Sequence, residues 1–158
     1  MNTLWENRCL AKEHFLNALA ILNDTRADAS EFIQVYNGLL HAHLDLTYHS
    51  GLGMDDREDY LRTAINYNNQ SLGIAQRLPI GQSWILAQVK LQQAVLRARE
   101  VQFRVKRGIE GSSRNLTERN TVIDEIEWAL GRLRESDHPN KEKSIAWGRQ
   151  FQDRLRRM

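Results

Sequence analysis

The chain has 158 residues, a formal net charge of +2 and a single cysteine, Cys9. This length suffices for one domain with its own core over residues 1–158, and a single cysteine excludes an internal disulfide. Charged residues are spread through the first thirty positions and no run of about eighteen apolar residues occurs, so neither a signal peptide nor a membrane span is expected. We therefore expect a soluble protein inside the cell, in the cytoplasm or the nucleus.

Helix-forming residues dominate the composition. Leucine, alanine, glutamine, arginine and glutamate are frequent, and the chain has only two prolines. Such a composition favours helix over strand. We expect an all-α fold of about six antiparallel helices stacked as hairpins, arranged either as an α-solenoid or as an ordinary helical bundle.

The first helix is predicted from Thr3 to about Asp24. Thr3 and Glu6 have the spacing of a capping box, which satisfies free N–H groups in a first helical turn. Apolar or small residues then recur at helical spacing: Trp5, Cys9, Ala11, Phe15, Ala18, Leu19 and Leu22. Cys9 is interpreted as a small core residue of this face.

The second helix is predicted to begin after Asp28 or Ser30, either of which can cap it, and to end near Ser50 and Gly51. Its wide apolar face comprises Phe32, Val35, Tyr36, Leu39, Leu40, His43, Leu46 and Thr47. His43 lies on this face, where we expect a core histidine that is hydrogen-bonded to a neighbour.

A helical hairpin is predicted over residues 55–107. Asp55 and Glu58 have capping-box spacing at its start, and Pro79 ends its first helix. The segment 84–96 is apolar almost all round, which favours a helix that is buried on both sides. A short loop between two helices makes them antiparallel neighbours.

Two further helices are predicted after a loop at 108–115. Asn115 and Glu118 have the spacing of a capping box for the fifth helix. Its apolar stripe is the cleanest in the chain: Val122, Ile123, Ile126, Ala129, Leu130 and Leu133. The last helix is predicted to begin at 137–139, with Pro139 in its first turn. Its narrower apolar face consists of Ile145, Gly148, Phe151 and Leu155.

Three helices share an apolar skeleton with the spacing x, x+4, x+7 and x+8. Its members are Ala11, Phe15, Ala18 and Leu19, then Ala64, Asn68, Ser71 and Leu72, then Val122, Ile126, Ala129 and Leu130. A small residue at x+7 followed by a bulkier one resembles the second helix of tetratricopeptide repeats. The resemblance implies stacked helical hairpins that bind a peptide in a groove. The copies lie further apart than the family period of about 34 residues, which implies elongated helices.

A polar stripe is predicted on the second helix. His41, Asp45 and His49 stand at i, i+4 and i+8, so they share one helical face. The two histidines lie about 12 Å apart along the axis, too far for one ion to contact both. A solvated stripe or the polar lining of a ligand groove is favoured over metal binding or acid–base chemistry. The chain contains no nucleophile, phosphate-loop or metal motif, so we expect no catalytic residue, metal or cofactor, and no enzyme.

Amide side chains cluster on the third predicted helix. Asn66, Asn68, Asn69 and Gln70 cluster around Tyr60 and Tyr67, a composition that suits a peptide-binding surface. A hydrated helical face explains the same cluster equally well.

Charge is distributed unevenly along the chain. Residues 1–80 carry 6 basic and 10 acidic side chains, whereas residues 81–158 carry 16 basic and 10 acidic ones. Arg97 and Arg104 belong to the basic half and are candidate partner-binding residues. Such polarity suits an acidic partner, head-to-tail stacking of two copies, or nucleic acid. Nucleic acid is the second choice, because acidic residues are interspersed among the basic ones.

Two tryptophans lie off the principal apolar faces. Trp128 lies well over 100° from the centre of the fifth helix's stripe, and Trp147 lies beside the stripe of the last helix. Aromatic residues in such positions suit contacts with a second surface, including a homodimer, or packing within the chain. The sequence therefore predicts a non-enzymatic adaptor that binds a peptide or partner helix in a groove between hairpins. The alternative is a nucleic-acid-binding accessory protein.

Overall fold

The computed structural model describes residues 4–24, 28–79, 83–108 and 112–158. Over these ranges the chain forms six α-helices and no strand, which confirms the predicted all-α fold. The helices are α1 (Leu4–Asp24), α2 (Ala29–Leu46), α3 (Met54–Ala75), α4 (Ser83–Arg107), α5 (Ser112–Arg134) and α6 (Lys141–Arg156). None of the helices in these ranges has both the length and the apolar character to cross a membrane.

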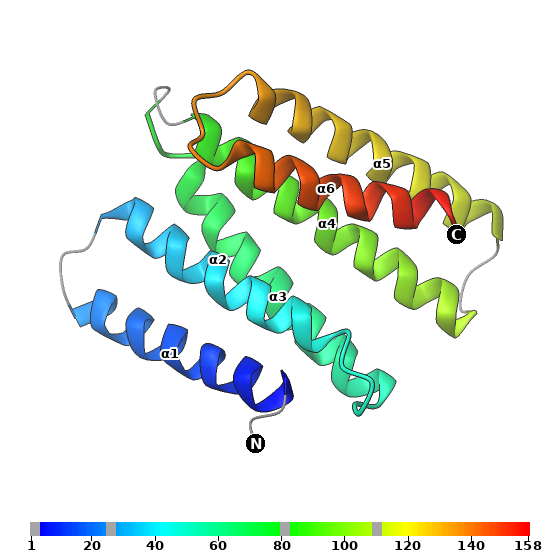
Figure 1. The fold of residues 1–158 in the computed structure, drawn as a ribbon, viewed down its shortest axis with the longest axis horizontal. Helices are drawn as coiled ribbons and strands as arrows, with labels where there is room; N and C mark the ends of the chain where they lie inside the picture. The colour runs from blue at the N-terminus through cyan, green and yellow to red at the C-terminus, as the bar shows by residue number, and fades with distance from the viewer. Residues whose placement is uncertain (1–3, 25–27, 80–82, 109–111) are drawn as a thin grey trace. The chain divides into compact units, whose positions relative to one another are not determined.

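The chain divides into two compact units, Met1–Leu78 and Pro79–Met158. In the first unit α2 packs between α1 and α3, and in the second α4, α5 and α6 all pack on one another (Figure 1). The boundary falls inside the hairpin predicted over 55–107. Both that hairpin and the single domain over 1–158 stay predictions.

The core of the first unit lies between α2 and α3. The buried residues of α3 are Leu61, Ala64, Asn68, Ser71 and Ala75, at the spacing expected of one helical face. On the other side of α2, a Cβ atom on Gly38 would lie 2.2 Å from Cε1 of Phe15. The Phe15 ring therefore packs directly on the α2 backbone, and only glycine leaves room for it.

The core of the second unit is built on the stripe predicted for α5. Five of its residues are fully inaccessible, at 0% exposure: Val122, Ile126, Ala129, Leu130 and Leu133. Helix α6 approaches this stripe at Gly148, where a Cβ atom would lie 2.9 Å from methyl groups of Leu130 and Leu91. The small residue at this point lets α6 contact both α4 and α5.

The predicted end of α2 and the predicted start of α3 are wrong. Helix α2 ends at Leu46, four residues before the predicted Ser50, and the Thr47 hydroxyl donates to the Leu44 carbonyl at 2.6 Å. Helix α3 begins at Met54 with Gly53 as its N-cap, so Asp55 lies in the first turn and does not cap the helix. The residue at the end of α2 is therefore a buried threonine whose hydroxyl bonds a carbonyl of its own helix. Helix ends more often carry glycine than threonine.

Helix starts at the other termini also differ from the predictions. Helix α5 already begins at Ser112, so much of the loop predicted over 108–115 is helical. Helix α6 begins at Lys141 after its N-cap Asn140, so Pro139 precedes the helix and does not enter the first turn. At Asp28, by contrast, the predicted cap forms, because its backbone N–H donates to the Glu31 carboxylate at 3.1 Å. The predicted cap Thr3 lies outside the described residues.

The shared skeleton of three helices is buried to different degrees. In α5 all four members are buried, in α3 three are buried, and in α1 all four are half-buried. Helix α1 contacts α2 on one side, whereas α3 and α5 each provide most of a core face. A tetratricopeptide-like arrangement stays a prediction.

Candidate functional site

A groove runs between α4 and α5 of the second unit. It contains one pocket of about 480 Å³ and another of about 350 Å³, volumes typical of ligand-binding pockets. The first is lined by Lys90, Gln93, Ala94, Arg97, Thr121, Asp124, Glu125 and Trp128. The second is lined by Trp84, Leu86, Ala87, Trp128, Arg132, Glu135 and Ser136. Because Trp128 lines both pockets, its side chain lies between them.

Trp128 is half exposed, at 52% of its surface. The core stripe of α5 passes through Ile126 and Leu130, each about 200° away on the helix, so the indole faces away from the core. The guanidinium carbon of Arg132, one turn later, lies 5.5 Å from the ring centroid, within range of a cation–π contact. This side chain therefore offers a large, oriented apolar surface to a partner.

The α4 wall of the groove contains two buried alanines. Ala87 lines one pocket and Ala94 the other, and seven residues place them about 10.5 Å apart along the helix. Small side chains at these two points leave the depressions open. Lys90 lies between them on the same face.

Two charges in the larger pocket have no internal partner. Arg97 is paired with Glu125 across α4 and α5. Lys90 and Asp124, in contrast, form no ion pair or hydrogen bond with any part of the chain that the structure describes. A free cation on α4 and a free carboxylate on α5 are therefore available to a bound partner.

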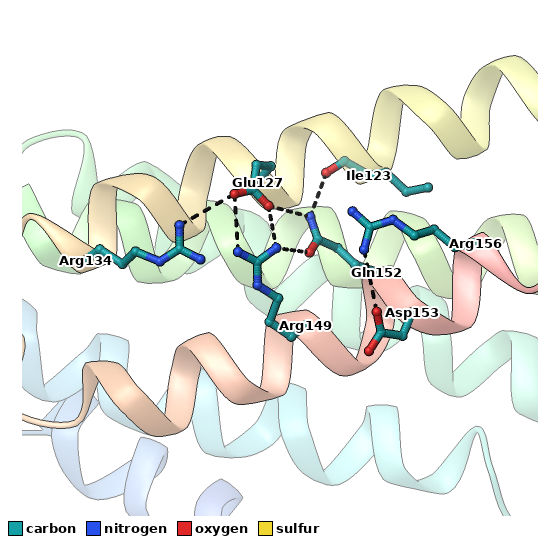
Figure 2. A network of polar contacts seen from close by, with 7 residues as sticks. All are labelled: Ile123, Glu127, Arg134, Arg149, Gln152, Asp153 and Arg156. Atoms are coloured by element: carbon teal, nitrogen blue, oxygen red, sulfur yellow. Dashed lines mark hydrogen bonds and ion pairs between the residues drawn. The ribbon is translucent and has the colours of Figure 1, made fainter.

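A hydrogen-bonded network holds α6 against α5, on the side of α5 that faces away from the groove. Figure 2 shows the Glu127 carboxylate accepting from both terminal nitrogens of Arg149, at 2.6 and 3.3 Å, and from Nε2 of Gln152 at 3.1 Å. Arg134 lies 3.5 Å from the same carboxylate. Gln152 also donates to the Ile123 carbonyl at 3.1 Å and accepts from Arg149 at 2.7 Å.

This network fixes which face of α5 stays open. Hydrogen bonds from Gln152 and then from Arg149 hold the pKa of Glu127 below its ordinary value, so the carboxylate stays ionised and bound. Trp128 follows Glu127 directly, about 100° further round α5. While α6 covers the Glu127 side, the indole is left on the side that α4 and α5 share.

Arg97 and Arg104, the arginines proposed for partner binding, are already paired with carboxylates. Arg104 contacts Glu118 of α5 and lies 3.7 Å from Glu100. Arg99 is buried, donates to Gln102 at 2.9 Å and lies over the Phe103 ring. These contacts reduce the positive charge available to a polyanion.

The amide cluster of α3 is divided by the fold. Asn66, Asn69 and Gln70 are exposed, as a binding surface requires, whereas Asn68 is buried and faces the core. Tyr67 is half-buried and stacks on His43 of α2, with ring centroids 5.4 Å apart and an interplanar angle of 10°. Tyr67 therefore packs α3 on α2, and its ring is engaged within the unit.

His43 occupies an unusual position in the first unit. It is 2% exposed and lies between the rings of Tyr60, at 5.8 Å, and Tyr67. Neither ring nitrogen has a hydrogen-bond partner within the described residues, so the predicted bond to a neighbour is wrong. Burial and, to a smaller extent, the nearby Lys12 cation together lower the pKa of His43 to about 4. The imidazole is therefore neutral near pH 7.

The predicted stripe of His41, Asp45 and His49 is broken. Helix α2 ends at Leu46, so His49 lies beyond it, where its Nδ1 accepts from the Gly51 N–H at 3.0 Å. Burial lowers the pKa of His41, and Asp45 opposes that shift. In the ranges that the structure describes, no set of three histidine, cysteine or acidic side chains could hold a metal ion.

Of the predicted partner-binding residues, the structure brings Arg97 and Trp128 together in the groove. Arg104 lies further along α4, and Trp147 packs edge-on against Phe151 of its own helix at 5.4 Å. Sequence reasoning missed Asp124 and the rest of the lining, because these side chains become neighbours only when α4 packs on α5. Comparison with protein-family models, curated proteins and solved structures found no match.

Proposed function

We propose that this chain is a non-enzymatic protein-interaction module that binds a peptide or partner helix in the groove between α4 and α5. The observation that carries the proposal is the half-exposed indole of Trp128, which separates two adjoining pockets. Tryptophan in such a position is a frequent anchor of protein interfaces. An aromatic ring also supplies a large contact area with few rotatable bonds.

The spacing of the groove favours a helical partner. Ala87 and Ala94 mark pockets that lie about 10.5 Å apart. Side chains at positions i and i+7 of a guest helix have the same separation. Helices that dock in grooves use anchors of this kind. A guest helix aligned with α4 would place one side chain in each pocket, on either side of Trp128.

The groove's polar groups suit recognition better than nucleophilic chemistry. Its hydroxyl groups, on Thr121 and Ser136, donate to carbonyls of their own chain at 3.0 and 2.6 Å. Lys90 and Asp124 are free to pair with charges on a guest. Nucleic-acid binding has weaker support, since Arg97 and Arg104 are paired with carboxylates.

Affinity capture from native cells followed by quantitative mass spectrometry tests the proposal. The wild-type chain is compared with Trp128→Ala and with Leu116→Ala, a control that alters another exposed apolar residue of α5. We expect a stoichiometric partner with the wild type and with Leu116→Ala, and its loss with Trp128→Ala. Retention of that partner by Trp128→Ala, or recovery of no partner with any variant, contradicts the proposal.

A further inference from the structure

The outward face of α5 has a charge pattern that complements itself. Asp124, Trp128 and Arg132 stand at i, i+4 and i+8, so they form one stripe about 12 Å long. Asp124 and Arg132 are exposed, and neither forms an ion pair within the described chain. The stripe therefore has a negative end, an aromatic centre and a positive end.

An antiparallel copy of the same stripe satisfies each of these groups. A two-fold axis at Trp128 places residue 128 + k of one copy opposite residue 128 − k of the other. Asp124 of each copy then faces Arg132 of the other, and the two indoles meet at the axis. About one turn further out, Thr121 faces Glu135, so no like charges of the two α5 stripes oppose each other. An isologous contact of this kind uses every favourable pair twice.

A parallel arrangement of the two stripes is disfavoured. It would place Asp124 opposite Asp124 and Arg132 opposite Arg132, and like charges in contact repel each other. The charge pattern therefore specifies both the partner and its direction.

We propose that a second copy of this chain occupies the groove, with its α5 antiparallel to the first α5 about a two-fold axis at Trp128. The inference rests on the proposed function, since it names the partner of the same surface. All of the residues involved belong to the second unit. Each Trp128 lies beside the pockets of the opposite copy, and the two charge pairs flank the indoles.

Sedimentation velocity over a concentration series at about 50 mM salt measures the association. We expect a dimer with a dissociation constant on the order of micromolar for the wild type. Asp124→Arg and Arg132→Asp, each alone, place like charges opposite each other and should weaken the dimer at least about tenfold. The double variant Asp124→Arg/Arg132→Asp restores opposite charges and should return to within about threefold of the wild type. Leu116→Ala should leave the dissociation constant unchanged.

Several outcomes overturn the inference. They are a wild-type monomer at every concentration up to about 100 μM, single reversals that bind as tightly as the wild type, and a double variant no tighter than the single ones. Far-UV circular dichroism shows whether a charge reversal perturbs the helices. If it does, the neutral variants Asp124→Asn and Arg132→Gln replace the reversals, and each should weaken the dimer. A monomeric chain that still captures another protein through Trp128 would overturn this inference and leave the proposed function standing.

Discussion

His43 in the first unit and Gln152 in the second unit are buried polar side chains that differ in their hydrogen bonding. The first unit encloses the imidazole of His43 between two tyrosines without a hydrogen bond from the described residues. In the second unit the buried amide of Gln152 has partners on both its nitrogen and its oxygen. An unsatisfied buried group costs free energy that a satisfied one does not. The comparison indicates that the titratable His43 makes the first unit sensitive to acid, whereas the Gln152 network holds α6 on α5 next to the groove.

The largest expected effect is the loss of core packing in the second unit. Leu130 is fully buried and contacts the site of α6 at Gly148, so Leu130→Ala should lower the free energy of unfolding by about 3 kcal/mol. Leu19 has the same skeleton position in α1 but is only half-buried, so Leu19→Ala should cost about 1 kcal/mol. Urea denaturation of both variants provides the measurement. Equal losses would mean that the two helices contribute equally to their cores.

The second prediction concerns acid. The folded pKa of His43, about 4, lies below its ordinary value of 6.5, so the folded state resists protonation. The stability contributed by the neutral imidazole is present above pH 6.5 and is lost as pH falls from 6.5 to 4. The first unit should lose about 2 to 3 kcal/mol over this interval, at 1.36 kcal/mol per pH unit with an allowance for partial screening. Hydrogen exchange of the α2 and α3 amides at several pH values measures this loss.

A matched variant isolates this histidine. Burial also lowers the pKa of His41 and His138, which contribute with the same sign. His43→Phe keeps an aromatic ring between Tyr60 and Tyr67 and removes the titrating group. The pH dependence of α2 and α3 should largely disappear in this variant. An unchanged slope would assign the acid sensitivity to other groups.

The third prediction tests the network that holds α6. Gln152→Ala removes the donor to Glu127 and to the Ile123 carbonyl, so it should lower the free energy of unfolding by about 2 kcal/mol. Gln150→Ala changes an exposed glutamine of the same helix and should stay within about 0.5 kcal/mol of the wild type. Thermal denaturation of both variants makes the comparison. A similar melting temperature for the two would show that the network contributes little.

Helix identity was predictable from the sequence because it depends on local periodicity. The stripe of α5 is a repeated spacing within one helix, and all of its predicted members are buried except Ile123, which is half-buried. Helix ends were less predictable. Helix α2 ends at its C-cap Thr47, although Ser50 and Gly51 lie nearby, and helix α3 begins after Gly53, although Asp55 and Glu58 have capping-box spacing. Capping signals compete locally, and packing of the whole helix decides between them.

The candidate site was predictable only in part. Trp128 could be found from its angle on one helix, which needs no knowledge of other elements. The α4 wall could not, since Lys90 and Asp124 become neighbours only when α4 packs on α5. Tyr67 is predicted on a binding surface because the sequence does not show that its ring stacks on His43 of another helix. Contacts between helices decide which polar residues remain available for binding.

The smallest expected effect on stability belongs to the residue with the largest proposed role. Trp128 is half exposed and lies outside the α5 core stripe, so Trp128→Ala should change the free energy of unfolding by less than about 1 kcal/mol. Trp5 of the first unit is engaged by His49 at 4.9 Å and Tyr60 at 6.3 Å, so Trp5→Ala should cost more, about 2 kcal/mol. Urea denaturation at a protein concentration below the proposed dimer's dissociation constant separates folding from association. If Trp128→Ala proves as destabilising as Trp5→Ala, the indole is part of the internal packing, and loss of binding in that variant would reflect a damaged fold.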